Sequence, residues 1–342
     1  MELESSIASF VRLGLCFREA VAGDSSVLTS GLIRLIRDHH HTNEWFTPEN
    51  ISSALSSYAQ NLTEENLQKW VGMYPEITRS RPSGTIAVIM AGNIPMVGFH
   101  DMLSVLITGN RITARTSSKD GLLIREIASV LTKIDKCFEE RIKFTDGTIG
   151  KFDAVIATGS DNTSRYFEYY FGAYPNLIRK NRTGIALLTA KETDDQLHAL
   201  GEDAFTYYGL GCRSVTKLYV PHGYDFSPLI RVWDSFRWLT NSGKYRNNYD
   251  YNRALAIVNR WNFIDTQFVI MKEESSLFSP VGVINYEYID SERNEEVFSL
   301  NQSKIQVIVG GDCFTSFGQA QKPRLWDYSD NMDTIGFLLK IN

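Results

Sequence analysis

Two short apolar runs, each closed by a turn and followed by a helical pattern, constrain the fold of this 342-residue chain more than any other feature. They are TIAVIM at residues 85–90, which precedes Gly92, and FDAVIA at residues 152–157, which precedes a Thr-Gly-Ser turn. Runs of this length, bounded by turns, are typical of buried strands. Strand, turn, helix and strand in succession indicate a parallel sheet with crossover helices. We therefore predict a doubly wound, nucleotide-type domain at residues 84–190.

Helical patterns precede this domain and a second α/β block follows it. Residues 1–80 carry apolar residues at three- and four-residue spacing, which predicts helices. The second block begins near Thr193 with a predicted helix at residues 195–208. Its predicted strands lie at residues 215–220, 267–271, 281–286 and 305–309.

Charge and composition exclude several classes of function. The net charge is −5 and no basic run occurs, so the sequence lacks the electrostatic footprint of a nucleic-acid-binding protein. An acidic residue follows Met1, where a secretory signal carries Lys or Arg. The longest apolar region, residues 85–108, contains Gly, Asn, Pro, His and Asp, which argues against a membrane span. We therefore expect a cytoplasmic protein that does not bind nucleic acid and has no membrane span.

The cysteines and histidines do not form a metal-binding or disulfide pattern. The four cysteines are too few and too scattered for a disulfide framework or a zinc site. They are Cys16, Cys137, Cys212 and Cys313. Three successive histidines at residues 39–41 cannot readily converge on one ion, so we interpret them as a solvated loop and expect no metal.

Cys212 has a setting that suits a nucleophile. Gly209 and Gly211 remove side chains just before it, which lets backbone and substrate approach closely. The predicted position between a helix end and a strand start is one where catalytic residues often lie. In such a turn the Cys212 backbone N–H can point at an oxyanion. A lone cysteine is also common as a small buried apolar residue, so the sequence leaves both interpretations open.

Asn93 and the turn at residues 158–160 are the other candidates for a site. Asn93 follows the first apolar run, and its side chain could either cap the next helix or donate to an oxyanion. The turn at 158–160 lies at a strand's carboxyl end, where open α/β sheets bind ligands, although an ordinary turn has the same pattern. No G-x-G-x-x-G follows a strand, so the common dinucleotide fingerprint is absent.

Several segments, taken in order, resemble one family. They are Gly92-Asn93-Ile94-Pro95, Ala157-Thr158-Gly159-Ser160-Asp161, Arg179-Lys180-Asn181-Arg182, residues 205–213 (FTYYGLGCR), Leu277-Phe278-Ser279-Pro280, and residues 323–328 (PRLWDY). From about residue 84 onward the chain is similar to the long-chain acyl-CoA (acyl-protein thioester) reductases of the LuxC type, a branch of the aldehyde dehydrogenase superfamily. The resemblance implies an aldehyde-dehydrogenase-like α/β fold with a doubly wound cofactor domain and an α/β catalytic domain.

The resemblance also implies domains and catalytic roles. It assigns residues 1–190 to a helical region and an NADP(H)-binding domain, residues 191–320 to a catalytic thiol domain, and residues 321–342 to a tail that packs back on the core. Cys212 corresponds to the catalytic thiol. Asn93 corresponds to the oxyanion-hole amide, which acts together with the Cys212 N–H.

A further set of residues is implied to bind the cofactor. Thr158, Gly159 and Ser160 are similar to the superfamily's loop near the cofactor phosphates. Arg115 takes the place of a cofactor-binding lysine. Ser118 stands where NAD-preferring members have a ribose-binding glutamate, so no carboxylate repels a 2′-phosphate there. With Arg115 and Lys119 beside it, we expect NADPH as the cofactor.

Two glutamates of the superfamily are absent from their expected positions. Residues 181–184 (NRTG) replace the Glu-Leu-Gly-Gly of hydrolytic members, and Ser276 replaces the glutamate that contacts the nicotinamide ribose. The first loss fits a reductase, because a thioester reductase must keep water out. The implied reaction is reduction of a fatty acyl thioester to the aldehyde.

The resemblance implies partners, and it leaves alternatives. The implied acyl donor is acyl-CoA or an acyl-carrying protein, and the implied partners are an acyl-transferring enzyme and further copies of this chain. A cysteine-dependent acyltransferase or thioesterase without hydride transfer is one alternative. A catalytically silent nucleotide-binding homologue is another.

Overall fold

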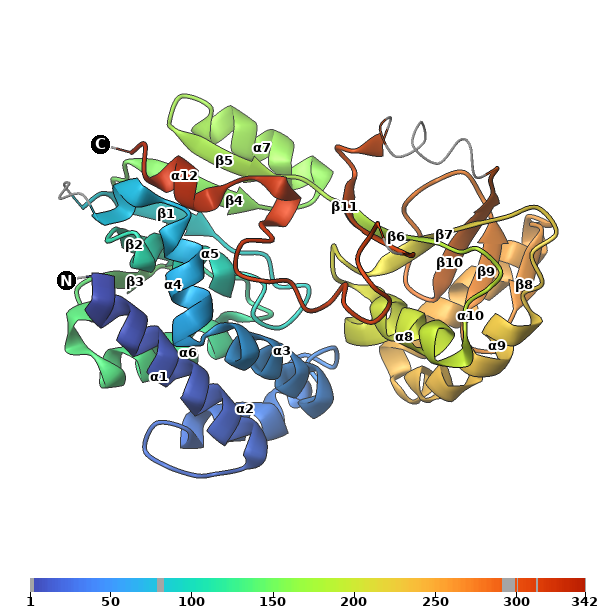
Figure 1. Cartoon of the computed structure of the whole chain (residues 1–342), viewed down its shortest axis with the longest axis horizontal. Helices are drawn as coiled ribbons and strands as arrows, with labels where there is room; N and C mark the ends of the chain where they lie inside the picture. The colour runs from blue at the N-terminus through green and yellow to red at the C-terminus, as the bar shows by residue number, and fades with distance from the viewer. Residues whose placement is uncertain (1–2, 79–82, 291–298, 300, 312, 342) are drawn as a thin grey trace. The chain divides into compact units, whose positions relative to one another are not determined.

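The computed structural model describes residues 3–78, 83–290, 299, 301–311 and 313–341. They form two compact units (Figure 1). Unit 1 comprises Met1–Asn181 and Arg324–Asn342, and unit 2 comprises Arg182–Pro323. Within the described ranges, no helix has both the length and the apolar character that crossing a bilayer requires.

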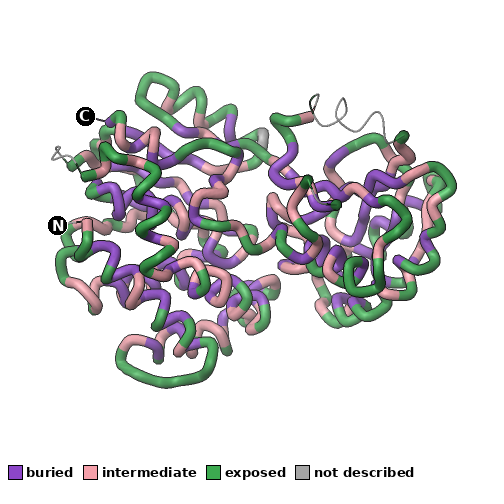
Figure 2. Tube along the Cα trace, viewed as in Figure 1, coloured by how far each residue is buried: buried purple, intermediate pink, exposed green. Residues whose placement is uncertain are grey.

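A five-stranded parallel sheet forms the centre of unit 1. Its strands are β1 (Thr85–Ile89), β2 (Arg111–Arg115), β3 (Ile142–Phe144), β4 (Ala154–Thr158) and β5 (Asn176–Arg179). Their order is β3-β2-β1-β4-β5, so successive strands wind to one side of β1 and then to the other. The predicted doubly wound sheet is therefore confirmed. The strands are apolar because both faces are covered, and Figure 2 shows the buried centre of this sheet.

Helices cover both faces of this sheet and form the N-terminal region. They are α1 (Leu3–Ala22), α2 (Ser30–Asp38), η1 (His39–His41), α3 (Pro48–Asn61), α4 (Glu64–Gly72), η2 (Pro75–Thr78), α5 (Phe99–Ile107), α6 (Gly121–Ile134), η3 (Lys136–Phe138) and α7 (Asp161–Phe171). The hydroxyl groups of Thr47 and Thr63 each accept a backbone N–H at the start of a helix, so they cap α3 and α4. Phe167 and Phe171 of α7 pack on the sheet face formed by Ala87, Val155 and Ala157.

The C-terminal residues of unit 1 are fixed by buried polar contacts. This segment contains η7 (Ser329–Asn331) and α12 (Thr334–Leu338). Tyr328 accepts a hydrogen bond from Trp70 Nε1 over 2.7 Å. Arg179, at the end of β5, donates to Asp101 of α5 over 2.7 Å and to Thr334 over 2.8 Å. Because these three side chains are buried, the contacts tie β5, α5 and α12 together.

Unit 2 is built on a six-stranded sheet of order β11-β6-β7-β10-β9-β8. The strands are β6 (Thr183–Leu187), β7 (Val215–Val220), β8 (Phe263–Asp265), β9 (Ile270–Glu273), β10 (Val283–Tyr288) and β11 (Ile305–Val309). Only the pairing of β8 with β9 is antiparallel among the described strands. The helices are α8 (Asp194–Phe205), η4 (Thr206–Gly209), α9 (Ser227–Trp233), η5 (Asp234–Asn241) and α10 (Gly243–Val258).

Three expectations about local structure are wrong. The helix predicted at 195–208 ends at Phe205, because Tyr207 and Tyr208 adopt left-handed backbone angles. The strand predicted at 267–271 runs from Ile270 to Glu273 instead, after a turn in which Gln267 has a φ of 72°. The histidines at 39–41 form a short helix rather than a solvated loop, and His39 is buried with its ring 5.1 Å from that of Phe46.

Candidate active site

The sites predicted in unit 1 lie at one edge of its sheet. Strand β1 is paired in parallel with β2 on one side and with β4 on the other. The carboxyl ends of parallel strands meet at the same edge, which is where open α/β sheets bind ligands. The structure therefore brings together the carboxyl ends of these three strands and the segments that follow them, at residues 90–98, 115–120 and 158–160.

The turn that carries Asn93 is built on a left-handed residue. Asn93 itself is exposed, whereas Pro95 and Met96 are buried. Met96 has a φ of 62°, a conformation that is costly for a residue with a side chain. The N-cap residue of α5 is Gly98, so the interpretation of Asn93 as the cap of the next helix is wrong.

The segment after β2 presents two cations. Arg115, Ser118 and Lys119 are exposed, and the Ser117 hydroxyl accepts the Lys119 N–H over 3.2 Å. Within the described part of the chain, neither Arg115 nor Lys119 forms an ion pair. Two unpaired cations beside a serine can attract a phosphate, since no carboxylate competes for them.

The segment after β4 leads directly into a helix. Ser160 is the N-cap of α7, and its hydroxyl accepts the Thr163 N–H over 3.4 Å. A Cβ at Gly159 would lie 3.0 Å from side-chain atoms of Phe167 and Thr163, so glycine lets the helix start close to the strand end. A helix N-terminus in this position favours anionic groups.

The nucleophile candidate in unit 2 follows an unusual run of backbone conformations. Tyr207, Tyr208 and Gly209 have φ values of 56°, 58° and 75° in succession. Each tyrosine is 6% exposed, so packing holds both residues in a conformation that a non-glycine residue rarely adopts. Cys212 then lies half-buried at the turn between η4 and β7, which contradicts the interpretation of it as a buried apolar residue.

The turn of Cys212 is fixed by its neighbours in unit 2. Ser214 N donates to the Gly211 carbonyl over 3.0 Å, and the Ser214 hydroxyl accepts the Gly211 N–H over 3.2 Å. Strand β6 passes directly behind this turn. Gly184 N donates to the Ser214 carbonyl over 3.0 Å, and a Cβ on Gly184 would lie 2.6 Å from the Arg213 carbonyl oxygen. Only glycine allows this approach without a shift of the backbone.

The other cysteines are less suited to form a thiolate. Cys16 is buried, and its burial raises the pKa of the thiol. Cys137 is exposed, and the hydrogen bond with Asp135 raises the pKa of its thiol. Cys313 is exposed. Because the thiolate is the nucleophilic form, the surroundings of Cys16 and Cys137 disfavour reactivity.

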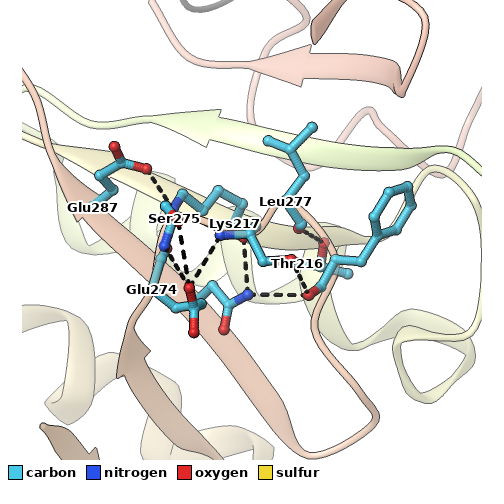
Figure 3. Close-up of polar contacts among 9 residues, drawn as sticks. Thr216, Lys217, Glu274, Ser275, Leu277 and Glu287 are labelled. Carbon is cyan, nitrogen blue, oxygen red and sulfur yellow. Dashed lines mark hydrogen bonds and ion pairs between the residues drawn. The ribbon is translucent and has the colours of Figure 1, made fainter.

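A buried lysine organises the segment of residues 274–277, as Figure 3 shows. The Lys217 side chain on β7 is 0% exposed, and its ammonium group donates to the Glu274 carbonyl and, over 2.7 Å, to Glu287 Oε2. Burial lowers the pKa of Lys217, while the hydrogen bond to Glu287 opposes that change. The neighbouring Thr216 hydroxyl donates to the Leu277 carbonyl over 2.8 Å. Two side chains of β7 therefore hold the 274–277 segment, because they donate hydrogen bonds to backbone carbonyls of that segment.

The first residue of this segment and the residue before it are glutamates, and both are hydrogen-bonded within unit 2. The Glu274 carboxylate accepts hydrogen bonds from Lys272 Nζ over 2.7 Å and from the Ser275 N–H over 2.9 Å. The hydrogen bond from Lys272 is the main reason that the pKa of Glu274 lies below its usual value. The Glu273 carboxylate accepts from Asn262 Nδ2 over 2.6 Å.

Sequence reasoning missed two buried ionisable residues near these turns. Lys217 stands within the apolar strand VTKLYV, and a single charge in such a run was a usable signal. Asp120 directly precedes the helix at 121–134 and therefore looks like an ordinary helix cap, although its side chain caps nothing. Among the described residues, no group of three or more His, Cys, Asp or Glu could hold a metal ion.

Comparisons with known proteins agree on family and fold. A family model described as "Acyl-CoA reductase (LuxC)" matches residues 35–227. Long-chain acyl-protein thioester reductase 2 of Photobacterium leiognathi is 19% identical over a match of 238 residues, and the match covers 63% of this chain and 49% of that protein. The chain thus spans about half the length of this curated relative.

Three solved structures with the same fold are dehydrogenases. An indole-3-acetaldehyde dehydrogenase in complex with NAD+ has a TM-score of 0.63 at 13% identity, over 94% of this chain and 74% of that one. The aldehyde dehydrogenase KauB of Pseudomonas aeruginosa has a TM-score of 0.61 at 14% identity, over 92% and 72%. The NADP complex of glyceraldehyde-3-phosphate dehydrogenase GapN of Methanocaldococcus jannaschii has 0.60 at 13%, over 92% and 77%. These likenesses confirm the predicted aldehyde-dehydrogenase-like fold.

Proposed function

We propose a function from one premise, which is that the chain belongs to the LuxC family of acyl-CoA reductases. The proposed reaction is reduction of a fatty acyl thioester, carried by CoA or by a protein, to the aldehyde. Cys212 carries the acyl group, and NADPH is the reductant. Unit 2 supplies the thiol and unit 1 holds the cofactor.

The turn of Cys212 is the observation that supports this proposal most. The Cys212 thiol is half-buried. Strand β6 approaches the turn of Cys212 closely at Gly184. Three residues that precede Cys212 in sequence are held in left-handed conformations. Strain of this kind is found at functional sites, where the surrounding structure over-determines the backbone. The family match at residues 35–227 includes Cys212, Asn93 and all the proposed cofactor residues.

In the first step the Cys212 thiolate attacks the carbonyl carbon of the thioester. The carbon–sulfur bond to the carrier breaks, the carrier thiol leaves with a proton, and the acyl group stays on Cys212 Sγ. Asn93 Nδ2 and the Cys212 N–H donate to the oxygen that becomes negative in this step. A donor of that kind typically contributes roughly 3–4 kcal/mol to transition-state stabilisation.

The residues at the edge of the unit 1 sheet fit NADPH. Arg115 and Lys119 are exposed cations without ion pairs among the described residues, and Ser118 places no carboxylate between them. Gly159 lets α7 begin close to the strand end, where Thr158, Ser160 and the helix N-terminus can hold the phosphates. When bound, NADPH supplies the hydride that, with a proton, converts the acyl carbonyl to the aldehyde and frees the thiol.

Glu273 and Glu274, which are candidates for a base that activates water, are bonded to other groups in the described part of unit 2. The general-base glutamate of hydrolytic relatives is replaced at residues 181–184. Glu274 is engaged by Lys272 and by backbone N–H groups, which lower its pKa, and Glu273 is bonded to Asn262. General-base assistance is typically worth about a hundred- to ten-thousand-fold. The acyl group on Cys212 is therefore expected to await reduction rather than hydrolysis.

A steady-state assay tests the proposal. Acyl-CoAs of increasing chain length are supplied with NADPH, the nicotinamide absorbance is followed, and the product is identified by chromatography. We expect NADPH consumption with one aldehyde formed for each NADPH, and no consumption by Cys212→Ala. Release of free CoA without NADPH consumption would instead indicate an acyltransferase or thioesterase. A protein that neither releases CoA nor consumes NADPH would be a silent homologue.

A further inference from the structure

Asp120 connects the two loops that the proposed function uses in unit 1. Its carboxyl group is 1% exposed, and Oδ2 accepts the Met96 N–H over 3.1 Å. Met96 is the left-handed residue three positions after Asn93, and its carbonyl accepts the Phe99 N–H at the start of α5 over 2.9 Å. Asp120 is the last residue of the 115–120 segment that carries Arg115. Its hydrogen bond with the Met96 N–H therefore connects that segment to the turn of Asn93.

The two loops are also packed tightly against each other. A Cβ on Gly92 would lie 2.5 Å from the Cβ and Oγ of Ser117 and 3.4 Å from the Asp120 backbone nitrogen. Glycine is therefore required at position 92 for the turn to rest on the 115–120 segment. The backbone contact and the Asp120 side chain fix the turn of Asn93 at both of its ends.

Burial of the Asp120 side chain costs free energy of folding, and this cost argues that Asp120 is not an ordinary helix cap. Asp120 precedes α6, yet its side chain makes no capping hydrogen bond there. Its second oxygen, Oδ1, has no hydrogen-bond partner among the described residues. A buried oxygen without a partner typically costs about 1–3 kcal/mol, so a cap alone does not account for this orientation.

We propose that Asp120 is a positioning residue that holds the Asn93 turn against the 115–119 segment and thereby fixes the position of the Asn93 amide. This inference rests on the proposed function, because it assumes that Asn93 is an oxyanion donor. Asp120 acts through the Met96 N–H and touches neither substrate nor cofactor in this role.

The experiment measures the rate at which Cys212 is acylated, in single turnovers without NADPH, using the acyl-CoA that turns over fastest. Rates for Asp120→Ala, Asn93→Ala and the double variant are corrected for the folded fraction. We expect Asp120→Ala to slow acylation about tenfold to a hundredfold, since misplacing a catalytic group by about 1 Å can cost that much. In the Asn93→Ala background the same substitution should have no further effect. Asp120→Asn, which can still accept the Met96 N–H, should restore most of the rate.

Two further variants separate positioning from stability. Asp153→Ala is the matched control, because Asp153 accepts the Thr85 N–H over 2.7 Å at the opposite end of β1. It should lower the melting temperature and leave acylation unchanged. Asp120→Ser, which keeps a polar group too short to reach Met96, replaces Asp120→Ala if that variant does not fold.

The outcomes distinguish this inference from the proposed function. Unchanged acylation in folded Asp120→Ala, with slow acylation in Asn93→Ala, would overturn the positioning role alone. Additive losses in the double variant would overturn it as well, because Asp120 would then act elsewhere. Unchanged acylation in Asn93→Ala would instead refute the oxyanion role in the proposed function, and the positioning role with it.

Discussion

The side-chain amide of Gln321 donates a hydrogen bond to the Ser214 hydroxyl over 3.3 Å. Ser214 also accepts the Gly211 N–H, and it lies two residues after Cys212. Gln321 belongs to the returning end of unit 2, so a segment more than a hundred residues away in sequence supports the nucleophile's turn. The same amide donates to the Asp203 carbonyl over 3.1 Å.

Gln321→Ala should therefore loosen the turn of Cys212. The loss of two hydrogen bonds should lower the free energy of unfolding by about 1–2 kcal/mol. Acylation of Cys212 should slow several-fold, because the turn that presents the thiol becomes less constrained. Urea denaturation and the acylation rate check the two effects. An unchanged acylation rate in a destabilised protein would show that Gln321 supports the fold of unit 2 but not the turn.

Gly184→Ala should disrupt the same turn from the other side. The added methyl group would lie 2.6 Å from the Arg213 carbonyl oxygen, so backbone atoms must move. We expect a destabilisation of about 1–3 kcal/mol and a loss of reductase activity of about tenfold or more. Gly243→Ala is the matched control in unit 2, because a Cβ there meets nothing within 4 Å. Equal activity in the two variants would contradict the close approach of β6.

Asp203 should make the stability of unit 2 depend on pH. Its carboxylate accepts the N–H groups of Gly318 over 2.7 Å and Ala320 over 2.8 Å, yet burial is the larger effect and raises its pKa from 3.8 to about 6. Because the pKa of Asp203 is higher in the folded than in the unfolded state, protonation of Asp203 stabilises the folded state. This contribution to the free energy of unfolding is complete below about pH 4. It is lost as the pH rises through about 6.

The comparison of wild type with Asp203→Asn isolates this effect. Between pH 4 and pH 7 the wild type should lose stability relative to the variant by an amount on the order of 1–3 kcal/mol. Urea midpoints at several pH values measure the difference. A difference that is constant over this range would show that Asp203 titrates as it does in the unfolded chain.

Ser118→Glu should erode the preference for NADPH. A carboxylate placed between Arg115 and Lys119 would repel a 2′-phosphate and neutralise the cations that attract it. We expect the affinity for NADPH to fall about tenfold, which is roughly 1.4 kcal/mol, with little change for NADH. Dissociation constants from the quenching of protein fluorescence check this. Equal use of both cofactors by the wild type would show that this segment does not read the 2′-phosphate.

The local structure that the sequence predicted best depends on short-range patterns. The strands at Val215–Val220 and Ile305–Val309 have the predicted bounds, because short apolar runs define them. Tyr207 and Tyr208 could not be anticipated, since tyrosine does not favour left-handed angles and only tertiary packing holds them there.

The site could be predicted only in part for the same reason. Asn93 stands out by its position after a strand, Cys212 by the two glycines that precede it, and Ser118 by the resemblance to the family. Asp120 and Asp203 do not, because their partners are backbone N–H groups far away in sequence, which no local pattern records.

The most direct test of the proposed function is a single-turnover experiment on the acyl group. The protein is incubated with acyl-CoA without NADPH, digested and analysed by mass spectrometry, and NADPH is then added to a parallel sample. The account predicts acylation of Cys212, persistence of the acyl-enzyme without cofactor, and release of one equivalent of aldehyde when NADPH is added. Acylation at Cys16, Cys137 or Cys313 instead, or release of free fatty acid as fast as aldehyde, would contradict it.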